Sequence, residues 1–423
     1  MSPTLPTTLE QWLAFIEQQH PASIALGLER VREVAARLGI ERPARQVIVV
    51  AGTNGKGSTV AFIDAIARAA GLRVGAYTSP HLERYNERVR IDGAEVDDAA
   101  LISAFQTVQQ ARGDTALTYF EYGTLAALWL FQQAGLDLAV LEVGMGGRLD
   151  AVNIVDADVS VISTVDVDHA EFLGQDREAI GAEKAGIIRG WKPVVLGEID
   201  PPSSVLRRAY LVGANALRFG SDFFAEPLDA TRWRWRDVSL RLELPLPALA
   251  GPMQLANAAS AIAALRASEL RIPRAAWAEG VAAARNPGRM EVFEHAGVEV
   301  LVDVGHNPHA AQAVARALAA RPCVGQTHAV LAMLADKDAA GVAAALAPQV
   351  QQWWLAGLDG ARGRDAVALA AAVAPAGVSG SAVANVADAL GQALAVAGPG
   401  DRVLVAGSFL TAAAARHWLL AHR

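Results

Sequence analysis

Cysteine is almost missing from the sequence, since Cys323 is the only one among 423 residues. A single thiol excludes an intrachain disulfide, so packing and hydrogen bonds must hold the fold together. A chain of this length can bury large cores without covalent cross-links. A reducing compartment such as the cytoplasm is therefore expected, although any compartment that does not require disulfides fits as well.

Long apolar runs are also missing. The N-terminal segment has no basic stretch, and Glu10 and Glu17 interrupt its apolar residues, so no signal peptide is expected. A long uncharged stretch, residues 366–387, is rich in alanine and is broken by Pro375 and by glycines. Because a membrane span needs about 20 strongly apolar residues, a membrane location is not expected.

Positive charge is not in excess. The sequence has 37 basic and 44 acidic residues, and its net charge of −7 argues against nucleic acid as the main partner. Small anionic substrates remain compatible with this balance, since local positive sites occur on acidic proteins. The alternation Trp233-Arg234-Trp235-Arg236 indicates a strand with one exposed face; base stacking on the tryptophans is the less favoured alternative.

Apolar and β-branched runs alternate with helical patterns along the first two thirds of the chain, which predicts a mostly parallel α/β sheet. Period-two patterns between residues 225 and 249 predict a small antiparallel edge sheet. Strands are expected at 46–51, 73–78, 138–143, 159–163 and 193–196, and helices at 9–18, 27–38, 59–70, 97–111, 120–134, 178–187 and 256–267.

A break at Asn286-Pro287-Gly288 predicts the domain boundary. We expect one α/β domain over residues 1–286 and a smaller one over residues 287–423. In the second, strands expected at 299–304, 328–332, 353–356 and 402–406 alternate with alanine-rich helices, which is typical of a Rossmann-like doubly wound sheet.

The strongest functional signal is the loop at residues 52–58, Gly-Thr-Asn-Gly-Lys-Gly-Ser. It follows an expected strand and precedes an expected helix, as a phosphate-binding loop requires. Backbone N–H groups of such a loop bind phosphate oxygens, Lys56 adds positive charge, and Ser58 offers a hydroxyl to Mg²⁺. The pattern is not the standard one, because Val50 stands where glycine is usual and Gly57 follows the lysine. The loop predicts ATP and Mg²⁺; a glycine-rich turn without a ligand is the alternative.

Further short motifs follow one another along almost the whole chain. They are Leu26-Gly27-Leu28-Glu29-Arg30, Ser79-Pro80-His81-Leu82, Thr118-Tyr119-Phe120-Glu121, Glu142 to Asp150, Asp168-His169, Glu183 to Ile187, Gln254 to Ala258, Pro287-Gly288-Arg289, Asp303 to Pro308 and Gly407-Ser408-Phe409. With the loop at 52–58, they resemble the amide-bond ligases that include the Mur ligases and the folylpolyglutamate synthases. Within that group the chain is similar to the bacterial bifunctional dihydrofolate synthase/folylpolyglutamate synthase family.

The resemblance implies a Mur-ligase-like P-loop ATPase domain that also binds the pterin, and a C-terminal domain that binds glutamate. The ATP-binding residues that it implies are Thr53, Asn54, Gly55, Lys56, Gly57, Ser58, Asn257, Arg289 and Asp303. The implied ligands of one or two Mg²⁺ ions are Ser58, Ser79, Glu142 and His169, and the implied catalytic residues are Lys56, His169 and Lys184, the last as a carbamyl-lysine.

Several of these residues also have an interpretation of their own. Ser79, Glu142 and His169 lie at or just beyond the carboxyl ends of expected strands, where ligand sites of open α/β sheets gather. Without the resemblance, His169 would be a turn residue beside Asp168, and Lys184 a solvated lysine on a helix. Carbamylation requires a neutral amine, which burial near other cations favours.

Substrate-binding residues follow from the resemblance in the same way. Those implied for the pterin are Ser23, Ile24, Ala25, Leu26, Thr118, Tyr119, Phe120, Glu121, Leu149, Asp150 and Ala151, and those implied for glutamate are His306 and Ser408. Loop capping is the alternative for the last two, and a boundary salt bridge for Arg289. Ala25 departs from the family, which usually has an acid there that can accept hydrogen bonds from a pterin; Glu29, Glu121 or water is left to take its place.

The reaction implied is ATP-dependent amide formation through an acyl phosphate, with dihydropteroate or tetrahydrofolates as acceptors of L-glutamate, and a monomer is expected. Three alternatives stay open. A monofunctional folylpolyglutamate synthase fits Ala25. A peptidoglycan Mur ligase is disfavoured by Thr118 to Tyr122 and by the little room before Gly52. A nucleotide-binding switch does not need a second domain with His306 and Ser408.

Overall fold

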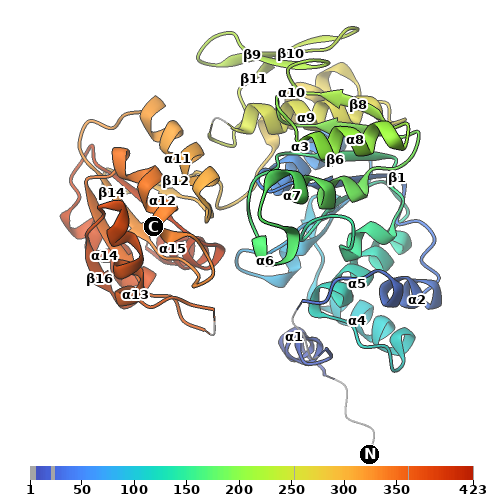
Figure 1. The fold of residues 1–423 in the computed structure, drawn as a ribbon, viewed down its shortest axis with the longest axis horizontal. Coiled ribbons are helices and arrows are strands. Elements are labelled where there is room, and N and C mark those ends of the chain that lie inside the picture. Colours follow the sequence, from blue (N-terminus) through green and yellow to red (C-terminus); the bar gives the residue numbers. More distant parts are fainter. Residues whose placement is uncertain (1–5, 21–23, 252, 361, 423) are drawn as a thin grey trace, which may run out of the picture. The chain divides into compact units, whose positions relative to one another are not determined.

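The computed structural model describes residues 6–20, 24–251, 253–360 and 362–422, and the chain divides into two compact units. The first comprises Met1–Ala248 and Leu255–Arg285, and the second comprises Leu249–Gln254 and Asn286–Arg423. Each unit has its own α/β sheet (Figure 1). The chain passes between units next to the expected break at Asn286-Pro287-Gly288, but a short earlier piece joins the second unit as well.

The first unit is built on an eight-stranded sheet of order β4-β3-β2-β5-β1-β6-β7-β8. Its strands are β1 (Ala44–Ala51), β2 (Val74–Tyr77), β3 (Val89–Ile91), β4 (Ala94–Glu95), β5 (Leu136–Glu142), β6 (Val159–Ile162), β7 (Pro193–Leu196) and β8 (Asn215–Arg218). The six strands from β2 to β8 in this order are parallel, and β3 and β4 add an antiparallel edge. All residues of β1 but Arg45 are buried, as expected for a central strand with a β-branched run.

Helices pack around this sheet, and side-chain caps mark where several of them begin. They are α1 (Leu9–Glu17), α2 (Glu29–Arg37), α3 (Lys56–Ala69), α4 (Asp98–Arg112), α5 (Tyr119–Ala134), α6 (Ala170–Leu173), α7 (Arg177–Lys184), α8 (Ser203–Leu211), α9 (Met253–Ala267) and α10 (Arg274–Ala283). Asp97 caps α4, and Thr118 caps α5. The helix expected at 178–187 is α7 and a following 3-10 helix, Ala185–Ile187.

The Trp-Arg alternation forms a separate three-stranded antiparallel sheet of β9 (Phe224–Pro227), β10 (Arg232–Arg236) and β11 (Arg241–Pro245), in the order β11-β10-β9. Trp233 and Trp235 are fully buried on one face, and the indole N–H of Trp235 donates to the Ala259 carbonyl at 3.1 Å. The arginines face the other side and pair with Glu226 and Glu243. One exposed face is therefore confirmed, and the buried indoles are not placed to stack on bases.

The second unit holds a six-stranded sheet of order β12-β13-β17-β14-β15-β16, in which only β12 is antiparallel. The four expected strands are β13 (Val298–Val302), β14 (Thr327–Leu331), β15 (Gln352–Ala356) and β17 (Arg402–Ala406), while β12 (Glu291–His295) and β16 (Ser381–Val383) were missed. Both are edge strands with exposed residues, so neither has a continuous apolar run. The helices are α11 (Pro308–Ala320), α12 (Ala339–Leu346), α13 (Ala366–Val373), α14 (Val386–Val396) and α15 (Phe409–Ala421).

The fold class predicted from the sequence is confirmed: a large, mostly parallel sheet, a small antiparallel sheet and a second α/β sheet. Within the part of the chain that the structure describes, none of the helices has both the length and the apolar character needed to cross a membrane.

Candidate active site

Several predicted site residues of the first unit lie at the carboxyl ends of its parallel strands. β2, β5, β1 and β6 are consecutive parallel neighbours, so their carboxyl ends lie side by side. Ser79 follows β2, Glu142 ends β5, the loop at 52–55 follows β1, and the segment 163–169 follows β6. The sheet topology therefore brings together groups that are far apart in the sequence, as open α/β sheets do around a ligand.

The loop after β1 depends on glycine at two positions. Gly52 has φ +152° and Gly55 has φ +87°, which are values that other residues rarely adopt. A Cβ on Gly52 would overlap the hydroxyl of Ser163, and one on Gly55 would lie 2.5 Å from Oδ1 of Asn257. The Lys56 ammonium folds back on this loop and donates to the carbonyls of Gly52 and Thr53 at 3.1 and 3.3 Å.

Further predicted ATP contacts lie at the end of this loop and beside it. Gly55 is the N-cap of α3, so the helix begins at Lys56 and its first turn carries Gly57 and the buried Ser58. An N-terminus that follows a glycine loop offers backbone N–H groups and a favourable dipole to phosphate. Asn257 of α9 lies against Gly55 from outside the loop, and its contact with adenine stays a prediction.

The predicted metal ligands combine few charged groups with hydroxyls. The backbone N–H of Ser79 donates to the buried carboxylate of Glu142 at 3.2 Å, which places these two residues together. His169 has φ +51°, and its carbonyl accepts the N–H of Phe172 at the start of α6. In the described ranges, three or more His, Cys, Asp and Glu side chains do not gather anywhere as a metal site. The set fits Mg²⁺ that also takes phosphate oxygens and water as ligands.

Lys184, at the C-terminal end of α7, is buried, and thus is not the solvated lysine that its helix position suggests. Burial and, next to it, the positive charge of Lys56 lower the pKa of Lys184 to about 7, and the charges of Asp168 and Asp150 oppose this shift. A large fraction of the amine is therefore neutral near pH 7.

Asp150 and Glu121 are the two buried carboxylates among the described residues predicted to bind the pterin. Asp150 accepts the backbone N–H groups of Met145 and Val152 at 2.9 and 3.0 Å. Burial raises the pKa of Asp150 to about 6, against these hydrogen bonds and the Lys56 charge. Its neighbours Leu149 and Ala151 are half-buried and buried.

Glu121 is occupied by its own surroundings. It forms a capping box with Thr118, in which its carboxylate accepts the Thr118 N–H at 2.8 Å. Arg30 pairs with both carboxylate oxygens, at 2.6 and 2.9 Å, and also donates to the Ala25 carbonyl. Glu121 is therefore poorly placed to replace the acid that Ala25 lacks, because the Arg30 guanidinium neutralises its charge and engages both of its oxygens.

The remaining pterin candidates lie around the start of α5. The Phe120 ring lies so close to Gly144 that a Cβ there would come within 2.7 Å of it, and the Tyr119 ring meets that of Tyr85 edge to face. Ile24 and Leu26 expose their apolar side chains. Ser23 lies outside the described residues.

In the second unit, Asp303 follows β13 and is buried; it accepts the N–H groups of Met290 and Gly305 at 2.9 and 2.7 Å. Burial raises the pKa of Asp303, and the nearby Arg289 opposes this. The Arg289 guanidinium lies 5.1 Å from the centre of the Phe409 ring, a cation–π contact, so Arg289 faces α15. Phe409 belongs to the motif Gly407-Ser408-Phe409, in which the sequence predicted a role for Ser408 alone. The structure adds Phe409 as a contact of Arg289.

The two residues predicted to bind glutamate have local partners. The His306 ring is 6.4 Å from that of Phe409, and its Nδ1 lies 3.1 Å from the Val304 carbonyl. The buried Ser408 hydroxyl caps α15 by accepting the Thr411 N–H at 3.0 Å. Capping is therefore one role of Ser408, and glutamate binding by either residue stays a prediction.

Comparisons with known proteins decide the family. The model of the Mur ligase middle domain matches residues 50–265, and that of the Mur ligase glutamate ligase domain matches residues 288–409. The chain belongs to the Mur ligase family. The chain is 47% identical over 413 residues to the dihydrofolate synthase/folylpolyglutamate synthase of Escherichia coli, and the alignment covers 97% of this chain and 96% of the relative.

Solved structures agree with this family assignment. E. coli FolC in complex with DHPP and ADP has a TM-score of 0.94 and 46% identity to this chain, with 99% of each chain covered. A bifunctional folylpolyglutamate synthase/dihydrofolate synthase with Mn, AMPPNP and L-glutamate bound has a TM-score of 0.91 and 45% identity, covering 99% of this chain and 100% of that one. The resemblance inferred from the motifs is confirmed, and a nucleotide switch without ligase activity is no longer a useful alternative.

Proposed function

We propose that this chain uses ATP to join L-glutamate to dihydropteroate, giving dihydrofolate, and to tetrahydrofolates, giving folylpolyglutamates. The observation that carries the proposal is the likeness over 99% of both chains to a protein solved with DHPP and ADP. The glycine-rich loop with Lys56 supports it, because such a loop suits ATP phosphates. The buried Lys184 supports it as well, because burial favours the neutral amine that carbamylation requires. The lone cysteine, Cys323, fits a cytoplasmic enzyme.

In the proposed mechanism, a carboxylate oxygen of the acceptor attacks the γ-phosphorus of ATP, the bond to ADP breaks, and an acyl phosphate forms. The amino group of glutamate then attacks the acyl carbon, phosphate leaves, and the nitrogen loses a proton to solvent. Lys56 and the N–H groups of the 52–58 loop stabilise the charge on the transferring phosphoryl group. The side chains position and neutralise, and none of them acts as a nucleophile.

Ser58, Ser79, Glu142 and His169 are the residues that we propose to hold Mg²⁺. When bound, Mg²⁺ neutralises charge on phosphate oxygens. In the second unit, we assign ATP binding to Arg289 and Asp303. We assign glutamate binding to His306 and Ser408. In this proposal residues 1–286 bind ATP and the pterin, and residues 287–423 bind glutamate.

We also propose that Lys184 works as a carbamate. Its neutral nitrogen adds to the carbon of CO₂ and releases a proton, which changes a cation into an anion. The low pKa of Lys184, about 7, supplies the neutral amine, and the positive charge of Lys56 stabilises the product. Burial protects the carbamate from water.

The alternative of a folylpolyglutamate synthase without the first activity rests on Ala25. Glu121 is neutralised by the Arg30 guanidinium, whereas the buried Asp150 accepts neutral backbone N–H groups, so we propose Asp150 as the carboxylate that meets the donor edge of a pterin. If Asp150 serves this purpose, both activities are retained in spite of Ala25.

The experiment measures phosphate release by the purified protein with ATP, Mg²⁺ and L-glutamate, and compares dihydropteroate with tetrahydrofolate as acceptor. We expect release with both, dependent on glutamate. Release with tetrahydrofolate alone would support the monofunctional alternative. Release with neither acceptor would contradict the folate assignment, and the acceptor of this chain would then have to be sought among other carboxylic acids.

A further inference from the structure

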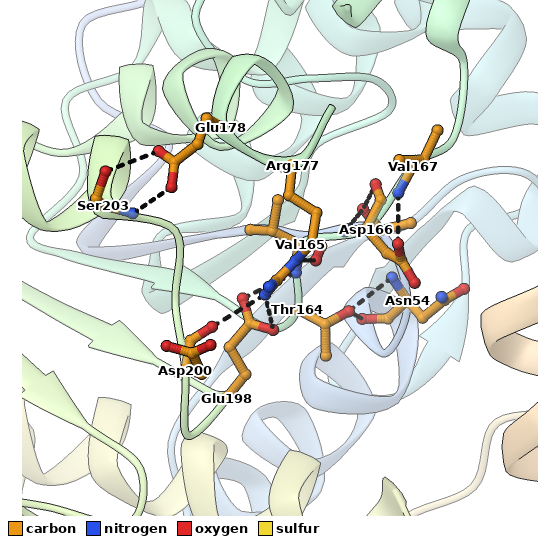
Figure 2. Close-up of polar contacts among 11 residues, drawn as sticks. Asn54, Thr164, Val165, Asp166, Val167, Arg177, Glu178, Glu198, Asp200 and Ser203 are labelled. Carbon is orange, nitrogen blue, oxygen red and sulfur yellow. Dashed lines mark hydrogen bonds and ion pairs between the residues drawn. The ribbon is translucent and has the colours of Figure 1, made fainter. Parts of the chain in front are cut away.

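The segment that follows β6 is the wall of the phosphate loop. The Thr53 N–H donates to the Thr164 carbonyl at 2.7 Å, and the Asn54 N–H donates to the Thr164 hydroxyl at 3.1 Å. The Thr53 side chain contacts the same segment, since its hydroxyl donates to the Asp166 carbonyl at 2.9 Å and accepts the Asp166 N–H at 3.0 Å. The shape of the loop at Thr53 and Asn54 therefore depends on where residues 164–166 lie (Figure 2).

Val165, between these two residues, turns its backbone the other way. Its N–H donates to the Glu198 carboxylate at 3.1 Å, and its carbonyl accepts from Nε of Arg177 at 2.9 Å. Figure 2 shows Arg177 and Glu198 beside Val165, with Asn54 and Thr164 next to one another on the other side. A pair of side chains takes the place that a neighbouring strand would occupy, because β7 ends at Leu196.

Arg177 and Glu198 also hold each other in place. Nη2 of Arg177 lies 3.1 Å from Glu198 Oε2 and donates to the Asp200 carbonyl at 2.9 Å. Arg177 is the first residue of α7, whose last residue is Lys184. Its guanidinium therefore ties the start of α7 to the segment after β6, at Val165, and to the segment after β7, at Glu198 and Asp200. A planar guanidinium can hold these acceptors at once, whereas an ammonium cannot.

We propose that Arg177 and Glu198 are positioning residues, which hold the segment 164–166 against the phosphate loop and so preorganise it for ATP. The inference rests on the proposed function in that the nucleotide is the ligand of this loop. It concerns affinity for the nucleotide more than global stability, because the pair is partly exposed, with 41% of the Arg177 and 19% of the Glu198 side chain accessible. Ion pairs of this kind contribute little to the free energy of unfolding.

The test compares Glu198→Gln and Arg177→Lys with the unchanged protein, measuring kcat, the KM of each substrate, and thermal unfolding. We expect Glu198→Gln to raise the KM for ATP about tenfold, the equivalent of ~1.4 kcal/mol, with the KM for glutamate unchanged. Arg177→Lys keeps the charge but loses the fork, so its KM for ATP rises as well. Direct binding of ADP by calorimetry should weaken in parallel, and reports on the loop even if the acceptor has been assigned wrongly.

Glu178→Gln is the matched control. Glu178 is the next residue of α7 and accepts the N–H groups of Ser203 and Ser204 at 2.8 and 2.7 Å, so it ties α7 to α8 without touching Val165. This substitution should change the KM for ATP by no more than about twofold, as surface substitutions usually do. The proposal is overturned if Glu178→Gln matches the effect of Glu198→Gln, if all KM values rise together with a lower Tm, or if ADP binding by Glu198→Gln is unchanged.

Discussion

The candidate sites of the two units differ in where their polar groups find partners. In the first unit, Thr53 and Asn54 bond to the segment after β6, and Glu142 bonds to the segment after β2. In the second, Asn307 and Ser408 each accept an N–H three residues along the chain, as helix caps do. The first site is thus assembled from distant segments, whereas much of the second is built from local turns. Replacing a site residue should therefore affect mainly catalysis in the first unit, and should affect stability as well in the second.

The largest effect is expected at Lys56. Lys56→Met removes the charge over the phosphate loop but keeps an apolar side chain of similar length, so kcat should fall about 10³-fold, as when one strong transition-state donor is lost. Thermal unfolding should change little. Single-turnover measurements of acyl phosphate formation check this, and a kcat within tenfold of the unchanged protein would contradict the role of Lys56.

A smaller but still large effect is expected at Lys184. Lys184→Arg cannot form a carbamate, and we expect kcat to fall about 100-fold, the size of a lost electrostatic group at a site. Nuclear magnetic resonance of the unchanged protein with ¹³C-labelled bicarbonate should show one carbamate that the variant lacks. The same spectrum from both proteins would exclude carbamylation at this residue.

The pKa of Lys184 sets the pH dependence of this prediction. Since the folded value is about 7 and the ordinary value is 10.5, the folded chain binds fewer protons than the unfolded chain between them, and stability rises with pH over this window. The amine is mostly protonated at pH 6 and mostly neutral at pH 8. Protein depleted of CO₂ should therefore regain activity faster at pH 8 than at pH 6 when the concentration of dissolved CO₂ is the same at both pH values, and equal rates would speak against a titrating Lys184.

Ser408 tests the other side of the comparison. Ser408→Ala removes the cap of α15 and should lower the free energy of unfolding by about 1 kcal/mol, with a higher KM for glutamate. Ser408→Asp restores the cap but places a negative charge beside an anionic substrate, so we expect recovered stability without recovered KM. If both recover together, Ser408 is a cap alone and its assignment to glutamate fails.

The smallest effect is expected at Ala25. If a carboxylate at this position can reach the pterin, Ala25→Asp should lower the KM for dihydropteroate about fivefold, the equivalent of one net hydrogen bond of ~1 kcal/mol. The KM for ATP should stay the same, which separates the change from a general one. Loss of dihydropteroate activity in Asp150→Asn would indicate that recognition already comes from the distant carboxylate.

Much of the fold follows from patterns that each segment carries by itself. β7 was predicted with the bounds it has, and α5 and β14 within one residue of theirs, because buried strands and capped helices leave periodic signals. β12 and β16 were missed, since edge strands lack an apolar run. The Trp-Arg strands were predicted as strands, but their separate sheet depends on α9, whose Ala259 accepts from Trp235.

The sequence by itself determined the glycine-rich turn at residues 52–58, because the strand before it and the helix after it are local patterns, and Gly52 and Gly55 allow backbone conformations that few other residues tolerate. The tertiary structure alone decided that Lys184 is buried with a low pKa, that Glu121 is engaged by Arg30, and that Arg177 and Glu198 meet at Val165. The physical reason is that desolvation and pairing depend on which segments the sheet brings together, and no periodicity within one segment encodes its distant neighbours.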